Sequence, residues 1–467
     1  MMRRFLLIIL LTILADSTLC ATHDSTKVKI IVTVNYGGEL FGKNPAYGTY
    51  PFLCTPQIAT YIKSHRAATP EGCFALKNIG SNINCAYRLF PANIAEQIES
   101  YLGYDKSELI TLAGKTFGFI QLDADLKSNR ENIRVFIERH SPDYLIGTFS
   151  GKTDPRVINN GVDIVLSGAQ DTSVFVLSLD DEGKLTGKEV NPEMLYLLPS
   201  DKDYFKYFYP IYENIEKFYD NEIVENQTEL LKADSFFGPS GYATLFHKFQ
   251  IETSGADISL FAPVNGDNDI IGEGILRRKK IVSIFRYISN EPMRLATIQL
   301  TGQEIKNILE VYYSGWFNRL GSAEDDLINV NRSKANGRLY PSSYSRNYSA
   351  SGINYTVNLT KPKGSMINDI VISNGEKFRT DESYSVAVFA NRLNSHGETF
   401  LTVTNIPATE RNGRITYTSD SDYVELFIQW LEKQQTIDIE PENNWKLLPE
   451  KWIESSAARI RAEVLAD

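Results

Sequence analysis

The stretch that most constrains the fold is a β-strand that runs straight into a capped helix at residues 300–318, read LTGQEIKNILEVYYSGWFN. Thr301 is followed three residues later by Glu304. This spacing predicts a capping box, in which each side chain accepts a hydrogen bond from the other residue's backbone N–H. The preceding residues 294–300, RLATIQL, are typical of a β-strand. The sequence therefore predicts a strand–turn–helix unit at a defined place in the chain.

The length of 467 residues is enough for at least two domains. In the front part, predicted strands alternate with predicted helices, which indicates a layered α/β domain. The rear part mixes strands and helices in an α+β manner. We predict domains at 25–200 and 231–440, with a linker helix within 201–230 and a C-terminal tail at 441–467. The linker is Tyr- and Phe-rich and is expected to be mostly helical after Pro210.

Local patterns give the expected elements. In the front domain, strands are expected at 28–34, 109–112, 117–122, 144–147, 162–167 and 174–179, and helices at 56–66, 93–102 and 129–140. In the rear domain, helices are expected at 240–252 and 423–432, strands at 257–261 and 284–288, and a polar loop at 321–351. Long loops in a compact domain often cover a binding site.

The N-terminal residues 1–21 read as a secretory signal peptide. Two arginines precede an apolar run at 5–14, and small residues follow near Cys20. A transmembrane anchor is less favoured, because a span needs about 20 apolar residues and Asp16 interrupts this run. No later segment is apolar enough to span a bilayer. We therefore expect an exported protein, periplasmic or extracellular.

The net charge and the cysteines bear on the partners and the redox state of the protein. The net charge of −10 argues against nucleic acid as a partner, so an anionic ligand must be met by a local basic pocket. Three cysteines, Cys54, Cys73 and Cys85, follow the signal peptide. Two of them could pair in an oxidising compartment, or all three could be buried and reduced.

Three stretches around the capped helix carry a family resemblance. They are residues 256–275 (ADISLFAPVNGDNDIIGEGI), 351–364 (SGINYTVNLTKPKG) and 389–400 (FANRLNSHGETF). In this order and spacing they resemble the C-terminal, substrate-binding domain of the secreted 5′-nucleotidase / UDP-sugar hydrolase family, in the variant common in Bacteroidetes bacteria. The resemblance covers roughly residues 230–405. It implies a 5′-nucleotidase-type α+β domain behind a metallophosphoesterase-like layered α/β domain, and a role in nucleotide catabolism.

The metallophosphoesterase site of this family holds two divalent metals between Asp, Asn and His ligands at strand ends, which generate hydroxide and clamp the phosphate. The residues at the matching places here are Asn35, Gly37, Ser81, Ala113, Gly114, Lys115, Thr116, Phe149, Ala169, Gln170 and Asp171. Asn35 and Asp171 could still offer oxygen atoms, but two such ligands give weak coordination. Lys115 in a ligand position would repel a cation.

The supply of histidine supports the same conclusion. The chain has five, namely His23, His65, His140, His247 and His396, and none falls at a predicted strand-end loop of the front domain. A site that needs several imidazoles cannot be built from them. We therefore predict a degenerate front domain with no catalytic residues, no metal ligands and no cofactor. A divalent metal pair is expected only if the enzyme is active through ligands in other places.

The resemblance also implies candidate ligand-binding residues in the rear domain: Arg286, Tyr348, Arg392, Asn394 and Glu398. Arginine suits anionic or planar groups, tyrosine suits stacking on a base, and Glu398 could accept hydrogen bonds from a diol. Each also has a structural explanation. Arg286 could pair with a surface carboxylate, Tyr348 could be core packing, and the turn from Arg392 to Glu398 could hold only an internal ion pair.

Three functions follow from these residues. The first is an exported member of the family that has lost its dimetal site and binds a nucleotide or nucleoside-like small molecule, with an active paralogue as a further partner. The second is an active metal-dependent phosphoesterase, a 5′-nucleotidase or UDP-sugar hydrolase. The third is a non-catalytic structural or interaction protein. Metal content with turnover separates the second from the others, and nucleoside binding separates the first from the third.

Overall fold

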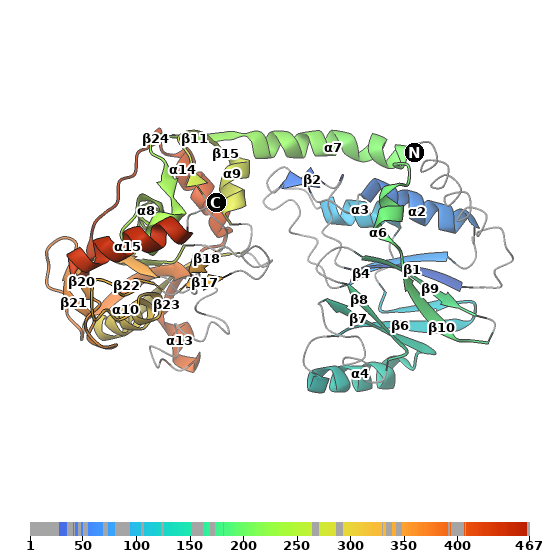
Figure 1. Ribbon diagram of the computed structural model, residues 1–467. Coiled ribbons are helices and arrows are strands. Elements are labelled where there is room, and N and C mark those ends of the chain that lie inside the picture. Colours follow the sequence, from blue (N-terminus) through green and yellow to red (C-terminus); the bar gives the residue numbers. More distant parts are fainter. Residues whose placement is uncertain are drawn as a thin grey trace. The chain divides into compact units, whose positions relative to one another are not determined.

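The protein forms two compact units, Met1–Lys217 and Phe218–Asp467, here called the front unit and the rear unit. The structure is a computed structural model (Figure 1). It describes residues 28–34, 41, 43–44, 48–49, 55–68, 73–79, 94–103, 107–122, 126–150, 162–168, 173–180, 182–263, 270–285, 293–328, 330–332, 339–341, 348–390, 393, 406 and 408–464. Helix α7, Lys202–Asp220, crosses the boundary between the units. Each unit is described by itself.

The front unit contains two four-stranded sheets, of strand order β10-β9-β1-β4 and β5-β6-β7-β8. Their bounds are β1 Val28–Val34, β4 Cys73–Ile79, β9 Ser173–Leu179, β10 Leu185–Glu189, β5 Leu109–Leu112, β6 Lys115–Leu122, β7 Tyr144–Ser150 and β8 Ile164–Gly168. One hydrophobic core takes residues from both sheets, among them Ile30, Phe117 and Leu177. The two sheets therefore pack face to face.

Helices cover the outer faces of these sheets (Figure 1). They are α2 Thr55–Ala68, α3 Ile94–Leu102, α4 Leu126–His140 and α6 Pro192–Tyr196. Ile133 and Phe136 of α4 form a second core with Leu122 of β6, and α2 contacts β4. The result is a layered α/β arrangement of helix, sheet, sheet and helix, as the alternation of elements predicts.

The rear unit is built around a five-stranded sheet of order β19-β13-β22-β16-β23. The strands are β13 Ile258–Phe261, β16 Leu295–Thr301, β19 Ser349–Ser351, β22 Ser383–Phe389 and β23 Ile415–Thr418. Alternate residues of β13 face opposite sides. Ile258 and Leu260 join the core that includes Ile305 of α10, whereas Phe261 stacks on Phe246 of α8 at 4.6 Å. Helices therefore cover both faces.

The capped helix predicted at residue 301 is confirmed. Helix α10, Gly302–Trp316, has Thr301 as its N-cap and a complete capping box. The Glu304 N–H donates to Thr301 Oγ1 at 3.2 Å, and the Thr301 N–H donates to Glu304 Oε2 at 2.8 Å. A Cβ added at Gly302 would stand 2.3 Å from the Arg379 carbonyl oxygen. Glycine is needed at this first helical position because the neighbouring backbone approaches so closely.

A buried carboxylate fixes a hairpin to the same helix. Strands β20 Ile353–Asn358 and β21 Ile367–Ile372 pair in a three-stranded sheet with β25 Trp445–Leu448. Glu310 of α10 is only 4% exposed and accepts the backbone N–H groups of Gly364, Met366 and Ile367 at 2.9, 3.1 and 2.9 Å. These bonds tie the hairpin to α10.

The other elements complete the rear unit. They are β11 Glu222–Asn226, β12 Leu230–Leu231, η2 Lys232–Phe236, α8 Gly241–Ser254, β14 Ile270–Ile271, β15 Gly274–Arg277, α9 Arg278–Ile284, β17 Val330–Arg332, β18 Leu339–Pro341, α13 Ala408–Arg414, α14 Tyr423–Glu432, β24 Thr436–Ile437 and α15 Glu450–Val464. The front unit also has the short strands β2 Lys43–Asn44 and β3 Gly48–Thr49. Within the described ranges, no helix has the length and apolarity that crossing a bilayer requires.

Some expected elements are wrong. The strand expected at 284–288 fails at its start, because Ile284 ends helix α9 and 286–288 lie outside the described residues. Four buried positions, Arg278, Ile281, Val282 and Phe285, have helical spacing, and a short apolar run cannot distinguish helix from strand. The loop expected at 321–351 contains the strands β17, β18 and β19. Strands β4 and β10 were not predicted.

The helix expected after Pro210 starts eight residues before it. Helix α7 begins at Lys202, where the Tyr204 N–H donates to Asp201 Oδ1 at 2.7 Å. Proline removes one helical hydrogen bond and disturbs the preceding turn. Buried Tyr204, Phe208 and Tyr212 recur every fourth residue on both sides of the proline. Packing of this apolar face outweighs the local cost of Pro210.

Candidate functional site

In the front unit, most positions matched to family metal ligands lie outside the described residues. Asn35, Gly37, Ser81, Ala169, Gln170 and Asp171 are among them. Lys115 is described, and its Nζ lies 3.2 Å from Asp143 Oδ1. The Thr116 N–H donates to the same carboxylate at 2.7 Å, and this bond, then Lys115, lowers the pKa of Asp143. The charge of Lys115 is therefore used in a surface ion pair.

The three described histidines lie on helices. His65 of α2 places Nδ1 3.0 Å from the Tyr61 carbonyl oxygen, and burial lowers its pKa. His140 ends α4, with its ring 4.8 Å from that of Phe136. His247 is inside the rear unit. Among the residues that the structure describes, no group of three His, Cys, Asp or Glu side chains could hold a metal ion.

His247 belongs to a buried chain of hydrogen bonds. Its Nδ1 lies 2.9 Å from Ser259 Oγ and its Nε2 3.0 Å from Ser349 Oγ. The Ser259 hydroxyl donates to Gln250 Oε1 at 2.6 Å, so its oxygen is left to accept from His247 Nδ1–H. Burial lowers the pKa of His247 to about 3. The ring is therefore neutral at neutral pH, and its Nε2 then accepts from the Ser349 hydroxyl.

Of the five predicted ligand-binding residues, four lie outside the described residues: Arg286, Arg392, Asn394 and Glu398. The fifth, Tyr348, is described and only 1% exposed. It lies in the main core of the rear unit and stacks on Tyr312 of α10, with ring centroids 4.5 Å apart. In this conformation Tyr348 offers no free ring face to a base, which agrees with the core-packing explanation.

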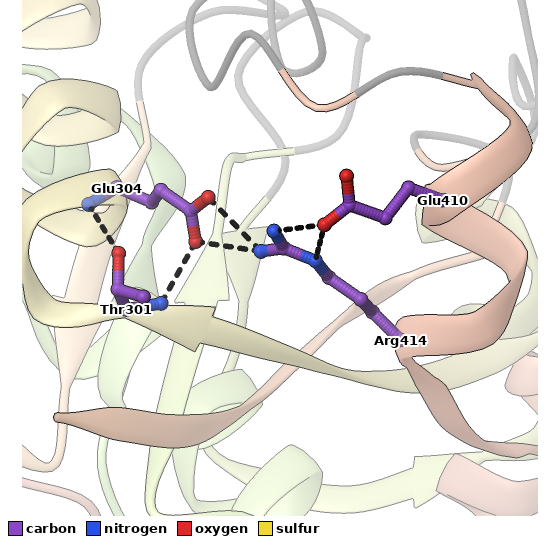
Figure 2. Close-up of polar contacts among 4 residues, drawn as sticks. All are labelled: Thr301, Glu304, Glu410 and Arg414. Atoms are coloured by element: carbon purple, nitrogen blue, oxygen red, sulfur yellow. Dashed lines mark hydrogen bonds and ion pairs between the residues drawn. The ribbon is translucent and has the colours of Figure 1, made fainter.

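The capping box extends into an ion-pair network (Figure 2). Arg414, at the end of α13, donates from Nη1 to both carboxylate oxygens of Glu304, at 2.9 and 3.0 Å. Its Nε and Nη2 contact Glu410 Oε1 at 3.0 and 2.5 Å. Glu410 and then Glu304 raise the pKa of Arg414. The carboxylate that caps α10 thus also holds α13.

Helix α13 makes a second contact one turn earlier. Arg411 Nη1 donates to the Leu393 carbonyl oxygen at 3.0 Å. Leu393 is fully buried, and its own N–H donates to the Ala390 carbonyl at 2.8 Å. The Ala390 N–H in turn donates to the Arg294 carbonyl at 2.9 Å, just before β16. Both main-chain polar groups of Leu393, which stands between Arg392 and Asn394 in the sequence, are therefore hydrogen-bonded.

Sequence reasoning did not identify Arg411 or Arg414. Their three-residue spacing in the stretch ERNGR places both on one side of a helical turn. Nothing in the sequence indicates that one would meet the capping carboxylate and the other a main-chain carbonyl. These are contacts between segments far apart in the chain.

The sequence comparisons support one family. The family "5′-nucleotidase, C-terminal domain" matches residues 223–404. A search of curated proteins finds no match to this chain. The matched range begins in β11 and runs past Leu393, so it contains the capped helix and the Glu310 contacts. All five candidate binding residues also lie between its ends.

The structural comparisons cover both units. A protein from Staphylococcus aureus described as a 5′-nucleotidase, in complex with α-ketoglutarate, matches with a TM-score of 0.54 and 12% identity, over 90% of this chain and 99% of that one. A 5′-nucleotidase precursor from Thermus thermophilus matches with a TM-score of 0.43 and 14% identity, over 91% of this chain and 99% of that one. The first likeness indicates a shared fold. The family match over residues 223–404 shows that the rear unit carries a 5′-nucleotidase C-terminal domain, and the family resemblance of the sequence is confirmed.

Proposed function

We propose that this protein is an exported member of the 5′-nucleotidase family that binds a nucleotide or nucleoside-like small molecule through its rear unit without efficient hydrolysis. Binding would use Arg392, Asn394 and Glu398, with Arg286 as a further basic group. The match of residues 223–404 to the family's C-terminal domain supports the ligand class.

The observation that carries the loss of hydrolysis is the shortage of imidazole. The chain has five histidines. His65 and His140 belong to helices of the front unit, and His247 is enclosed between two serines in the rear unit. Only His23 and His396 remain, and by sequence neither belongs to a strand-end loop of the front unit. Dimetal hydrolysis needs several such ligands at one rim.

A second candidate is an active metal-dependent phosphoesterase. It is favoured by the likeness of fold to the Staphylococcus aureus protein, which extends over 90% of this chain. In that case a divalent metal pair would be held by front-unit residues outside the described ranges. A chain with neither metal nor ligand would instead be a structural or interaction protein.

Metal analysis combined with turnover tests the proposal. We expect purified full-length protein to hold less than stoichiometric Mn, Zn or Co, and to release no phosphate from AMP or UDP-glucose when these metals are added. Calorimetry should then detect binding of AMP or adenosine, weakened in Arg392→Ala. Stoichiometric metal with turnover would overturn the proposal in favour of the phosphoesterase. Absence of binding to AMP and adenosine would overturn it in favour of the interaction protein.

A further inference from the structure

We propose that Arg411 is a positioning residue for the proposed ligand site, and that α13 acts as a brace between the capping box of α10 and the backbone at Leu393. This proposal rests on the proposed function, because Arg392 and Asn394 flank Leu393. It concerns residues that no family motif pointed to.

The anchor is the Glu304–Arg414 pair (Figure 2). Arg414 donates to both oxygens of Glu304, whose side chain is only 15% exposed. One of these oxygens also accepts the Thr301 N–H, so the carboxylate cannot move without breaking the cap of α10. Bonds between charged partners in such a position are stronger than neutral ones. The end of α13 is therefore fixed to the N-terminus of α10.

The contact is the bond from Arg411 Nη1 to the Leu393 carbonyl oxygen, 3.0 Å long. A guanidinium is well suited to this task, because its planar fork is rigid and permanently charged. The bond acts on main chain whose other polar groups are already committed, since the Leu393 N–H is bonded to Ala390 and the Ala390 N–H to Arg294. These three hydrogen bonds, to the Leu393 carbonyl and from the Leu393 and Ala390 N–H groups, give the backbone at Leu393 one orientation.

No competing role for Arg411 is found among the described residues. Within the described residues, Arg411 forms no ion pair, since Glu304 and Glu410 both pair with Arg414. The Nε atom of Arg411 is buried without a hydrogen-bond partner. An arginine kept half-buried in this way loses solvation. The Leu393 bond is thus what the side chain contributes, which suits a residue that acts through the main chain.

Amide exchange measured by NMR or mass spectrometry on the full-length protein tests the brace without any ligand. Arg411→Met keeps the apolar stem but removes every donor. We expect the Ala390 and Leu393 amides to exchange about tenfold faster in it, from the loss of one charge-assisted bond. Arg411→Lys, which keeps one donor, should restore most of the protection. Arg414→Met should raise exchange at the same amides by a smaller factor. Unchanged exchange in Arg411→Met would overturn the proposal.

The matched control is Arg379→Met, because Arg379 pairs with Glu382 at 3.4 Å with both side chains more than half exposed. It should leave exchange at Leu393 unchanged, and an equal rise there would overturn the proposal by revealing a general loosening. Arg411→Met should weaken the binding of AMP about tenfold, with the unfolding midpoint of the rear unit preserved. When Arg411→Met is added to the Arg392→Ala variant, it should weaken AMP binding much less, because the two substitutions act on one contact. Additive effects would overturn the coupling.

The two proposals can fail separately. If wild-type protein binds neither AMP nor adenosine, the proposed function fails, and the exchange experiment alone decides whether Arg411 fixes Leu393. If AMP binds and depends on Arg392 but Arg411→Met binds as tightly as wild type, the brace fails as a positioning device and the proposed function stands.

Discussion

The two units of this protein use polar side chains in different ways. In the rear unit, polar groups are buried and join segments far apart in the sequence: Glu310 holds the β20–β21 hairpin, and His247 links α8 to β13 and β19. In the described part of the front unit, most of the ion pairs lie at the surface, although Asp201, which pairs with Lys63, is only 10% exposed. Arg134 pairs with Glu131 and Glu138 within one helix, and all three side chains are more than half exposed.

The two units therefore differ in the interactions that specify their folds. The front unit follows from alternating apolar strands that close a core between two sheets. The rear unit adds buried polar contacts, each of which leaves an unsatisfied group behind if its partner is removed. Substitutions of these buried polar residues of the rear unit should therefore be costly, whereas substitutions in the exposed ion pairs of the front unit should be nearly silent.

The largest effect should come from Glu310→Ala. It leaves three backbone N–H groups without their acceptor, two of them buried. We expect a loss of about 4 kcal/mol in the free energy of unfolding of the rear unit. All four tryptophans belong to that unit, so their fluorescence during urea unfolding reports on it alone. Glu310→Gln keeps one acceptor and should lose about half as much. A loss below about 1 kcal/mol would break the comparison.

Acid should weaken the rear unit through His247. Its pKa is about 3 when folded and about 6.5 when unfolded. Between these values the unfolded chain binds a proton and the folded chain does not, so stability is complete above pH 6.5 and falls as the pH drops towards 3. The expected slope is about 1.4 kcal/mol per pH unit. Tryptophan fluorescence between pH 6.5 and 5 measures it.

The control for this slope is His247→Gln, which has no titrating group at that position. It should unfold with little dependence on pH in the same window. Residual slope would have to come from other groups. His65 in the front unit is one, because burial also lowers its pKa, but tryptophan fluorescence does not report on that unit. An unchanged slope in His247→Gln would contradict the burial of a neutral ring.

Removing the helix cap should have a moderate effect. Thr301→Ala loses the acceptor for the Glu304 N–H and should lower the free energy of unfolding of the rear unit by about 1 kcal/mol. Thr301→Ser keeps the hydroxyl and should lie close to wild type. If alanine and serine behave alike, the cap contributes nothing and the strand alone fixes the start of α10.

The smallest effect is expected in the front unit. Arg134→Ala removes two surface ion pairs of α4 at once. Solvent and salt screen such pairs, and holding long side chains in place costs entropy. We expect no measurable change in the unfolding midpoint followed by far-UV circular dichroism. A shift as large as that of Thr301→Ala would remove the contrast between the units.

Much of the fold could be predicted because it is local. Strand β1 and helix α14 have the predicted bounds, and the capping box of α10 follows from a three-residue spacing. Errors arose where tertiary packing decided the outcome. Helix α7 continues through Pro210 because its apolar face is buried. The strand expected at 284–288 is wrong at its first residue, which ends α9, because an apolar run this short has no clear period.

The candidate site could be predicted less well. Motifs pointed to Arg392 and Asn394, but the contact that fixes the backbone between them comes from Arg411. That side chain has no local signature, because its partner is a main-chain carbonyl in another segment. Tyr348 is a residue type that can stack on a base, but its side chain is buried in the core. An aromatic ring gives the same signal in a sequence for either use.

Two strands that come late in the chain set an order on the synthesis of the rear unit. Strand β11, at the start of the unit, pairs in parallel with β24, and β20 pairs in parallel with β25. Almost the whole unit is translated between the two members of the first pair. Neither sheet can therefore close on the ribosome until β24 and β25 emerge, and a nascent chain must wait with open strand edges, which chaperones would be expected to shield.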